Sequence, residues 1–500
     1  MTWNALFAAS IVILAVVLIH QGGPKKAFYL MTALLPATGF FVDIGVSLSA
    51  SKVIGLILCF SLLATWLQQG VTGRVQSLGL VFLLYAAVVT TVGRILAPVP
   101  TLDSTELRVE MRPFVQMFSL FLQMLPLFLA PLILRSKADI LATVKAFFWG
   151  TGLLAFGGVL QGVIYWIWGF NAFSIYREGL FGETMDVGKI DYAGDVIYRS
   201  NSLAREPKDM GAALAIAAIT WLLLRSAGVI KSFVLSCLYI GLLLLAAVLS
   251  FSTSAAFILC IGAVVVIPTS IAIRLKRGGN SLEVENENTR GQHSARHTWL
   301  IKPAAAAISI AICLGVIFLW YETIIEMMPY FSDLFSLRVL DRIGEIEDFD
   351  EVTLEFLTTE PHWALFGVGT GNLPWYAFSY LRNDHPDFQY MQSLTWNAKS
   401  GLLAMLTSYG FMGLCILGSI IGIVLSVLLR GIRHHHRELE TILAAVGILV
   451  FIVGVHALRA VDDFFWLALG VAVAQAQLHA IAPLQLQSVR LQAGTRSPAS

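Results

Sequence analysis

Long apolar runs alternate with short polar loops along almost all of the 500 residues. A transmembrane helix needs about 20 predominantly apolar residues. Runs near this length predict helices at 5–20, 27–47, 53–68, 77–97, 114–134, 140–168, 209–225, 230–250, 254–274, 301–321, 401–429, 440–458 and 463–482. The pattern predicts an all-α polytopic membrane protein with about 12–14 transmembrane helices and two large extracytoplasmic loops.

Basic residues gather in alternate loops, which marks those loops as cytoplasmic. They are Lys25, Lys26, Arg74, Arg135, Lys137, Arg225, Lys231, Arg274, Lys276, Arg277, Arg430, Arg433 and Arg437. The first apolar run is preceded by no cation, so we expect an uncleaved first helix with its N-terminus outside. The tail 483–500 is then cytoplasmic.

Two polar segments on the outward side, 169–208 and 322–400, are long enough to carry function. They separate N-terminal helices (1–168) from helices in 209–274 and 300–321 and from C-terminal helices (401–482). Segment 275–299 is polar and rich in Gly, Asn and Glu, which is typical of a disordered cytoplasmic linker. Apolar residues at helical spacing between Leu334 and Ile343 predict a short amphipathic helix on the outer surface.

The composition agrees with this class of protein. Only 13% of residues are charged, 57% are hydrophobic, and the mean hydropathy is +0.76. Soluble domains carry roughly 25% charged residues. The five cysteines all lie in apolar runs, so no disulfide framework or zinc pattern is predicted. No basic cluster resembles a nucleic-acid footprint.

The first outward segment ends in a cluster of cations. Arg199, Arg205 and Lys208 lie just before the next apolar helix, and Glu206-Pro207 separates the last two. Guanidinium groups bind phosphate oxygens bidentately, and a helix N-terminus adds partial positive charge. The cluster predicts a phosphate site near the membrane surface. Surface ion pairs, or anchors for lipid headgroups, are the alternative.

The second outward segment contains glycines at every second position, Gly367, Gly369 and Gly371. They follow no strand, so a Rossmann nucleotide site is excluded, and a turn that orders the loop is the simpler interpretation. His385 follows Asp384 and could be a general base near neutral pH. A solvated loop histidine is the alternative.

Two further cations of this segment, Arg338 and Arg342, could assist phosphate binding. The acidic stretch 345–351 either balances the positive charge of these arginines or is a solvent-exposed face. It lacks the alternating ligand pattern of a calcium loop, so we expect no metal and no cofactor. Arg94 and Arg112 complete the cations on this side, and we expect Arg94 to extend toward the membrane surface.

Three motifs, in order, resemble those of the bacterial O-antigen polymerase and O-antigen ligase superfamily. The first is Arg199 followed by Glu206-Pro207 and Gly211. The second is the stretch 361–372, Pro-His-Trp-Ala-Leu-Phe-Gly-Val-Gly-Thr-Gly-Asn, and the third is the 406–414 stretch with its two glycines. The chain departs from the family where many members carry a His-Asn pair, because Lys399-Ser400 stands at that spacing. The Glu-Pro form is nearer to exopolysaccharide and capsule polymerases.

The resemblance implies the fold of glycosyltransferases that use polyprenyl-linked donors. It implies transfer of a glycan from undecaprenyl pyrophosphate to another lipid-linked repeat unit, at the outer face of the bacterial inner membrane. Partners would include a flippase and a chain-length regulator. Arg199 and Arg205 would hold the pyrophosphate, with Arg338 or Arg342 assisting, and Glu206 or His385 would be the base.

Other functions remain open on the sequence. A ligase of the same superfamily would transfer polymer to a lipid A-core sugar. A transporter of such glycans would place charges at the bilayer midplane and often show repeated halves, neither of which is evident here. A non-catalytic scaffold of envelope assembly is the remaining alternative.

Overall fold

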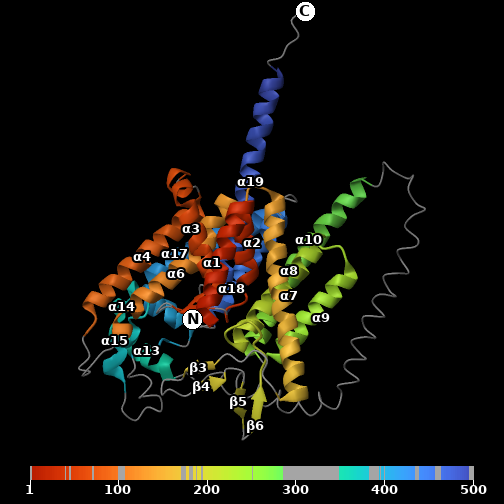
Figure 1. Ribbon diagram of the computed structural model, residues 1–500. Coiled ribbons are helices and arrows are strands. Elements are labelled where there is room, and N and C mark those ends of the chain that lie inside the picture. Colours follow the sequence, from red (N-terminus) through yellow and green to blue (C-terminus); the bar gives the residue numbers. More distant parts are fainter. Residues whose placement is uncertain are drawn as a thin grey trace, which may run out of the picture. The chain divides into compact units, whose positions relative to one another are not determined.

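The computed structural model confirms an all-α polytopic membrane protein (Figure 1). It describes residues 3–284, 348–381, 394–433, 438–456 and 463–494, apart from gaps at 40, 44–46, 70–72, 99–106, 170–175, 179–183, 187–188, 193–194, 251, 395 and 399. Within these ranges 6 helices are long and apolar enough to cross a membrane. Shorter apolar helices accompany them, and the predicted span 301–321 lies outside the described residues, so the total number stays a prediction.

The chain divides into two compact units, residues 1–150 with 348–500, and residues 151–347. Helices of the first unit are α1 (Trp3–Gly22), α2 (Pro24–Leu34), α3 (Ala50–Gln69), α4 (Arg74–Leu96), α5 (Leu107–Glu110), α6 (Arg112–Ile133), the start of α7 (Lys137–Trp168), α13 (Asp348–Thr359), α14 (Pro361–Phe366), α15 (Leu373–Ala377), the 3-10 helix η2 (Phe378–Tyr380), α17 (Gly401–Arg433), α18 (Glu438–His456) and α19 (Asp463–Gly494). The rest of α7 belongs to the second unit, with α8 (Pro207–Ser226), α9 (Phe233–Leu249) and α10 (Thr253–Val284).

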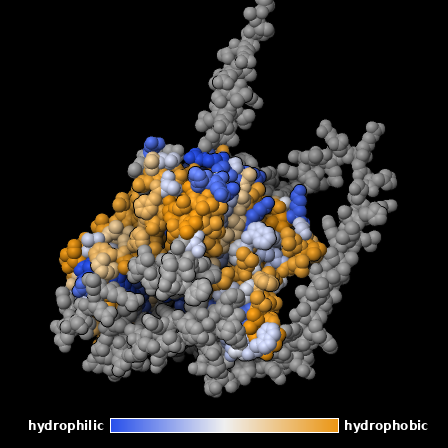
Figure 2. Space-filling model, viewed as in Figure 1, coloured by the Kyte–Doolittle hydropathy of each residue, from blue (hydrophilic) through white to orange (hydrophobic). Residues whose placement is uncertain are grey.

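The centre of the first unit is built by helices from both ends of the chain. α19 packs along α6 and α18, and α17 packs along α18 and α4. A Cβ on Gly470 of α19 would collide with the carbonyl of Pro126 in α6, so the two backbones meet closely there. Large side chains such as Phe82, Trp466 and Phe465 are fully buried. The faces of α1 and α4 seen in Figure 2 are mostly apolar and exposed, as a lipid-facing surface requires.

The predicted span 27–47 is wrong. α2 ends at Leu34, and the chain continues into an antiparallel hairpin of β1 (Phe41–Asp43) and β2 (Ser47–Ser49). Pro36 lies just past this end and has no N–H to donate to the helix ladder, although Leu35 before it keeps helical dihedral angles (φ −54°, ψ −42°). Hydropathy did not register this break because the residues around Pro36 are themselves apolar.

The first outward segment contains strands that the sequence analysis did not predict. β3 (Tyr176–Glu178) pairs with β4 (Thr184–Asp186), and β5 (Lys189–Tyr192) pairs with β6 (Asp195–Tyr198), both antiparallel. The alternation of polar and apolar residues in β5 and the Val-Ile-Tyr run in β6 were the available signals, but each strand is only 4 residues long. The second hairpin leads directly into the Arg199 cluster.

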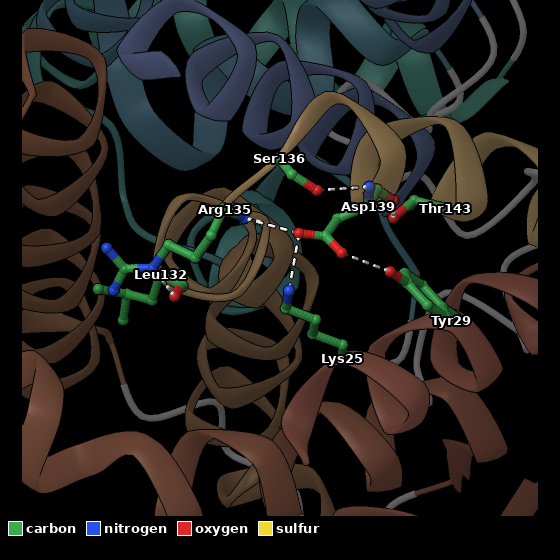
Figure 3. A network of polar contacts seen from close by, with 7 residues as sticks. All are labelled: Lys25, Tyr29, Leu132, Arg135, Ser136, Asp139 and Thr143. Carbon is green, nitrogen blue, oxygen red and sulfur yellow. Dashed lines mark hydrogen bonds and ion pairs between the residues drawn. The ribbon is translucent and has the colours of Figure 1, made fainter. Parts of the chain in front are cut away.

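A polar network ties the start of α2 to the start of α7 (Figure 3). Asp139 accepts hydrogen bonds from Lys25 Nζ at 2.9 Å, from the Arg135 backbone N–H at 3.1 Å and from Tyr29 OH at 3.3 Å. Ser136 accepts from the Asp139 backbone N–H and so caps α7. The loops around Lys25 and Arg135, which the charge pattern assigns to one side of the membrane, therefore lie together.

Candidate functional site

A buried turn carries the cation cluster of the first outward segment. Ser200, Asn201 and Ser202 are each 1% exposed and connect β6 to the start of α8. The Ser200 backbone N–H donates to the Leu249 carbonyl at the end of α9, and the Ala204 N–H donates to the Asn201 carbonyl. The segment between the two arginines is thus a packed part of the second unit.

Gln161 of α7 holds this turn. Its Oε1 accepts from the backbone N–H groups of Asn201 at 3.0 Å and Ser202 at 2.7 Å, and its Nε2 donates to Asn201 Oδ1 at 2.9 Å. Asn201 Nδ2 in turn donates to the Ala204 carbonyl at 3.2 Å. A single fully buried amide therefore satisfies the N–H groups of Asn201 and Ser202, while that of Ser200 bonds to Leu249.

Glycines let the turn approach α7. A Cβ on Gly157 would collide with the Ser202 hydroxyl, and one on Gly162 would lie 3.3 Å from the Ser200 hydroxyl. Ser202 adopts φ +49°, in the left-handed region that non-glycine residues seldom occupy. Close packing over this glycine face and the Gln161 hydrogen bonds together hold the strained residue in place.

Arg199 and Arg205 flank the buried turn in different environments. Arg199 is half-buried and follows Tyr198, whose buried ring stacks on Tyr165 of α7 with centroids 3.8 Å apart. Arg205 is exposed at the other end of the turn, one residue before the cap of α8. The fold therefore places the two arginines at the two ends of one hydrogen-bonded turn.

The Glu206-Pro207 pair opens α8, as the sequence predicted. Glu206 is the N-cap and Pro207 the first helical residue, where its missing N–H costs nothing. The Glu206 side chain forms no cap; it pairs with Lys208 Nζ at 2.7 Å. Gly211 lies one turn into α8, where a Cβ would lie 2.5 Å from that of Ser252 and 3.0 Å from that of Ala255. The motif that begins at Arg199 therefore has a glycine at position 211 because α8 lies very close to the start of α10 there.

Three other predicted site residues, His385, Arg338 and Arg342, lie outside the described residues, as do the predicted helix 334–343 and residues 345–347 of the acidic stretch. Their roles stay predictions. Among the residues that the structure describes, no group of three His, Cys, Asp or Glu side chains is arranged to hold a metal ion.

The glycine-rich stretch of the second outward segment packs against helices. Gly367, Gly369 and Gly371 all have positive φ. A Cβ on Gly369 would collide with the backbone of Thr90 in α4, and one on Gly367 would lie 2.7 Å from the Ser408 carbonyl oxygen in α17. These glycines order the loop, as the simpler interpretation of the sequence held.

This stretch runs along α4. The Tyr85 hydroxyl donates to the Phe366 carbonyl at 2.7 Å, Asn372 Nδ2 donates to the Thr90 carbonyl at 3.0 Å, and the Tyr376 hydroxyl donates to the Gly93 carbonyl at 2.6 Å. Tyr85 is near the middle of α4, about 16 Å from the Leu96 end at about 1.5 Å per residue. Segment 361–377 therefore runs beside α4 from the level of Tyr85 to that of Gly93, and several of its backbone groups bond to protein partners.

Two cations at this end have structural partners. The Arg94 guanidinium lies 4.1 Å from the ring centroid of Trp375, a cation–π geometry, so its position is set by this contact. Arg112 donates to the carbonyls of Leu394 at 2.8 Å and Trp396 at 3.2 Å. The expectation that Arg94 extends toward the membrane surface stays a prediction; its aromatic partner Trp375, far away in sequence, could not be predicted from the pattern.

Comparison of the chain with protein-family models and with curated proteins finds no match. The buried turn with its two arginines and the three sequence motifs are therefore what indicates a function for this chain. Gln161 and Asn201 were missed by the sequence analysis, because a glutamine inside a long apolar run carries no periodic signal. Glu360, which is considered below, was also missed.

Proposed function

We propose that the protein is a membrane-embedded glycosyltransferase that binds a polyprenyl-pyrophosphate-linked glycan at the Arg199–Arg205 element. The observation that carries the proposal is the buried Ser200-Asn201-Ser202 turn, fixed by Gln161, with an arginine before it and another after it in the chain. The chain is a multi-pass membrane protein, so a lipid-linked substrate can reach it from the bilayer. The reaction is polymerisation of a surface polysaccharide at the outer face of a bacterial inner membrane.

The chemistry of this donor suits arginines. When the anomeric carbon is transferred, the bond to pyrophosphate breaks and negative charge develops on the departing oxygen. Guanidinium groups can neutralise that charge through bidentate hydrogen bonds. Removing one preorganised contact of this kind costs on the order of 10²–10³ in rate, by analogy with oxyanion-hole donors.

Glu206 has a restricted role in this proposal. Its carboxylate pairs with Lys208 Nζ at 2.7 Å, so one of its oxygens is already engaged by a cation. We propose that Glu206 orients the acceptor hydroxyl or accepts its proton, with His385 as the other candidate base. Partners of the reaction are a lipid-linked acceptor, a flippase that supplies it and a chain-length regulator.

The test is glycan transfer by the purified protein in nanodiscs, with a lipid-linked repeat unit as both donor and acceptor. Arg199→Lys and Arg205→Lys are expected to lose activity nearly as completely as the alanine variants. Lysine keeps the positive charge but cannot form the bidentate hydrogen bonds of a guanidinium group. Arg74→Lys, at an exposed arginine that begins α4, is the matched control and should retain activity. Full polymer length in both loop variants would refute the pyrophosphate site.

Deletion in the host decides between polymerase and ligase. Caps of a single repeat unit on the cell surface support the polymerase, whereas accumulated lipid-linked polymer supports the ligase. The transporter alternative predicts neither product but retained substrate on the cytoplasmic face.

A further inference from the structure

The short helix α14 starts beside a carboxylate with aromatic partners. Glu360 is the N-cap of α14. Its Oε2 accepts from Trp363 Nε1 at 3.0 Å, and its Oε1 accepts from the Tyr380 hydroxyl at 3.3 Å. His362 Nε2 lies 3.8 Å from Oε2. We call Glu360, His362, Trp363 and Tyr380 the Glu360 cluster.

The aromatic rings of the cluster stand on a rigid base. Phe356 is fully buried, with ring centroids 6.1 Å from Tyr376 and 6.0 Å from Tyr380. Trp363 packs edge-to-face on Tyr376 at 4.8 Å, and the Tyr376 hydroxyl is bonded to α4. Because these neighbours are fixed, the orientation of the carboxylate is fixed as well.

The cluster nevertheless remains open to solvent. The Glu360 side chain is 40% exposed and that of His362 is 61% exposed, while Trp363 and Tyr380 are half-buried. A carboxylate offers about four acceptor positions, and the two protein donors use two of them. The carboxylate therefore keeps acceptor positions that suit hydroxyl or amine donors of a ligand.

The geometry points to the Glu360 cluster as a binding site for the sugar residues of an oligosaccharide, with the ring hydroxyls donating to Glu360 and an apolar sugar face against Trp363. Aromatic rings are negative on their faces, so they favour the C–H edge of a sugar. The inference deepens the proposed function, because it assigns the acceptor glycan to this cluster.

A basic peptide is the other ligand that a carboxylate attracts. The cluster holds one carboxylate with His362 beside it, a second carboxylate, Glu355, acts on Tyr380, and Arg94 lies over the neighbouring Trp375. The nearby cation and imidazole oppose a cationic chain, whereas they do not oppose neutral hydroxyl donors. Hydroxyl donors with an apolar face fit the same residues better.

Binding is measured by equilibrium dialysis with nanodisc-embedded protein. The probe is the repeat-unit oligosaccharide, released from its lipid carrier by mild acid and labelled. We expect saturable binding that falls about tenfold or more in Glu360→Gln, since a charge-assisted hydrogen bond is lost. His362→Ala leaves the bonds to Trp363 and Tyr380 intact and should weaken binding less. Glu351→Gln makes the same change on the exposed face of α13 and should bind normally.

The two proposals fail separately in these assays. Arg199→Lys is expected to lose transfer while it keeps oligosaccharide binding, and Glu360→Gln to raise the acceptor KM more than it lowers kcat. Absence of oligosaccharide binding by a wild-type protein that still transfers glycan would overturn the acceptor site alone. Displacement of the probe by oligolysine, or unchanged binding in both Glu360→Gln and His362→Ala, would also overturn it.

Discussion

Replacing Gln161 by leucine tests whether the buried turn positions the arginines. The substitution replaces the polar amide by an apolar side chain of similar size in α7. It removes the acceptor for the backbone N–H groups of Asn201 and Ser202, and the donor to Asn201 Oδ1. Arg199 and Arg205 keep their identity, so any loss of function comes from their placement.

The expected cost follows from these bonds. A buried donor left without its partner costs about 1–3 kcal/mol, so two stranded N–H groups cost about 2–6 kcal/mol unless the turn moves. Even the lower figure corresponds to about a 30-fold shift toward a displaced turn. If the displaced turn cannot bind pyrophosphate, kcat/KM falls in proportion to the remaining competent fraction.

Two measurements report this shift. Glycan transfer reports the competent fraction, and the rate of tryptic cleavage after Arg205 reports local opening of the turn. Asn201→Ala keeps both N–H bonds to Gln161, so it should fall between wild type and Gln161→Leu in both assays. Leu160→Ala, at the exposed neighbour in α7, should behave as wild type.

Unchanged transfer together with unchanged tryptic cleavage in Gln161→Leu would refute the reasoning. Increased cleavage with unchanged transfer would show that the turn opens but does not position the catalytic cations. In that case the pyrophosphate site would have to be sought among residues other than Arg199 and Arg205.

Further predictions concern stability and the reaction. Gly369→Ala places a Cβ against Thr90 at a positive φ, so we expect loss of folded protein in detergent, measured by thermal unfolding. Asp139→Asn removes the ion pair with Lys25, which is partly exposed, and should lower stability by about 1 kcal/mol, less at high salt. Burial, then the charge of a nearby carboxylate, raises the pKa of Tyr376 from 10.0 to about 12. Its neutral form is favoured in the fold, so the stability that Tyr376 contributes is complete below pH 10 and declines as the pH rises to about 12, whereas Tyr376→Phe should show no such decline. Transfer should survive EDTA, because arginines neutralise the leaving group; loss restored by magnesium would contradict this.

Periodicity and charge predicted much of the helical fold because each span is a local property of about 20 residues. The start of α8 could also be predicted from neighbouring residues alone, because a proline at the first helical position, as in Glu206-Pro207, marks a helix N-terminus. The exceptions depend on contacts distant in sequence. Gln161 binds a turn 40 residues away, and α17 contains a non-helical residue at Gly410, where segment 365–367 packs against it. Such contacts leave no periodic signal in either partner.

Substitutions in the three motifs that carry the family resemblance report on different properties of the protein. Gly211, Gly369 and Gly410 each lie where another backbone or side chain leaves no room for a Cβ, so their substitution disturbs folding whatever the protein does. The two arginines flank a turn that is already held by Gln161, and lysine can replace either of them without loss of charge. Glycine variants therefore report on the architecture, and only the arginine-to-lysine variants separate a bidentate phosphate site from a surface anchor.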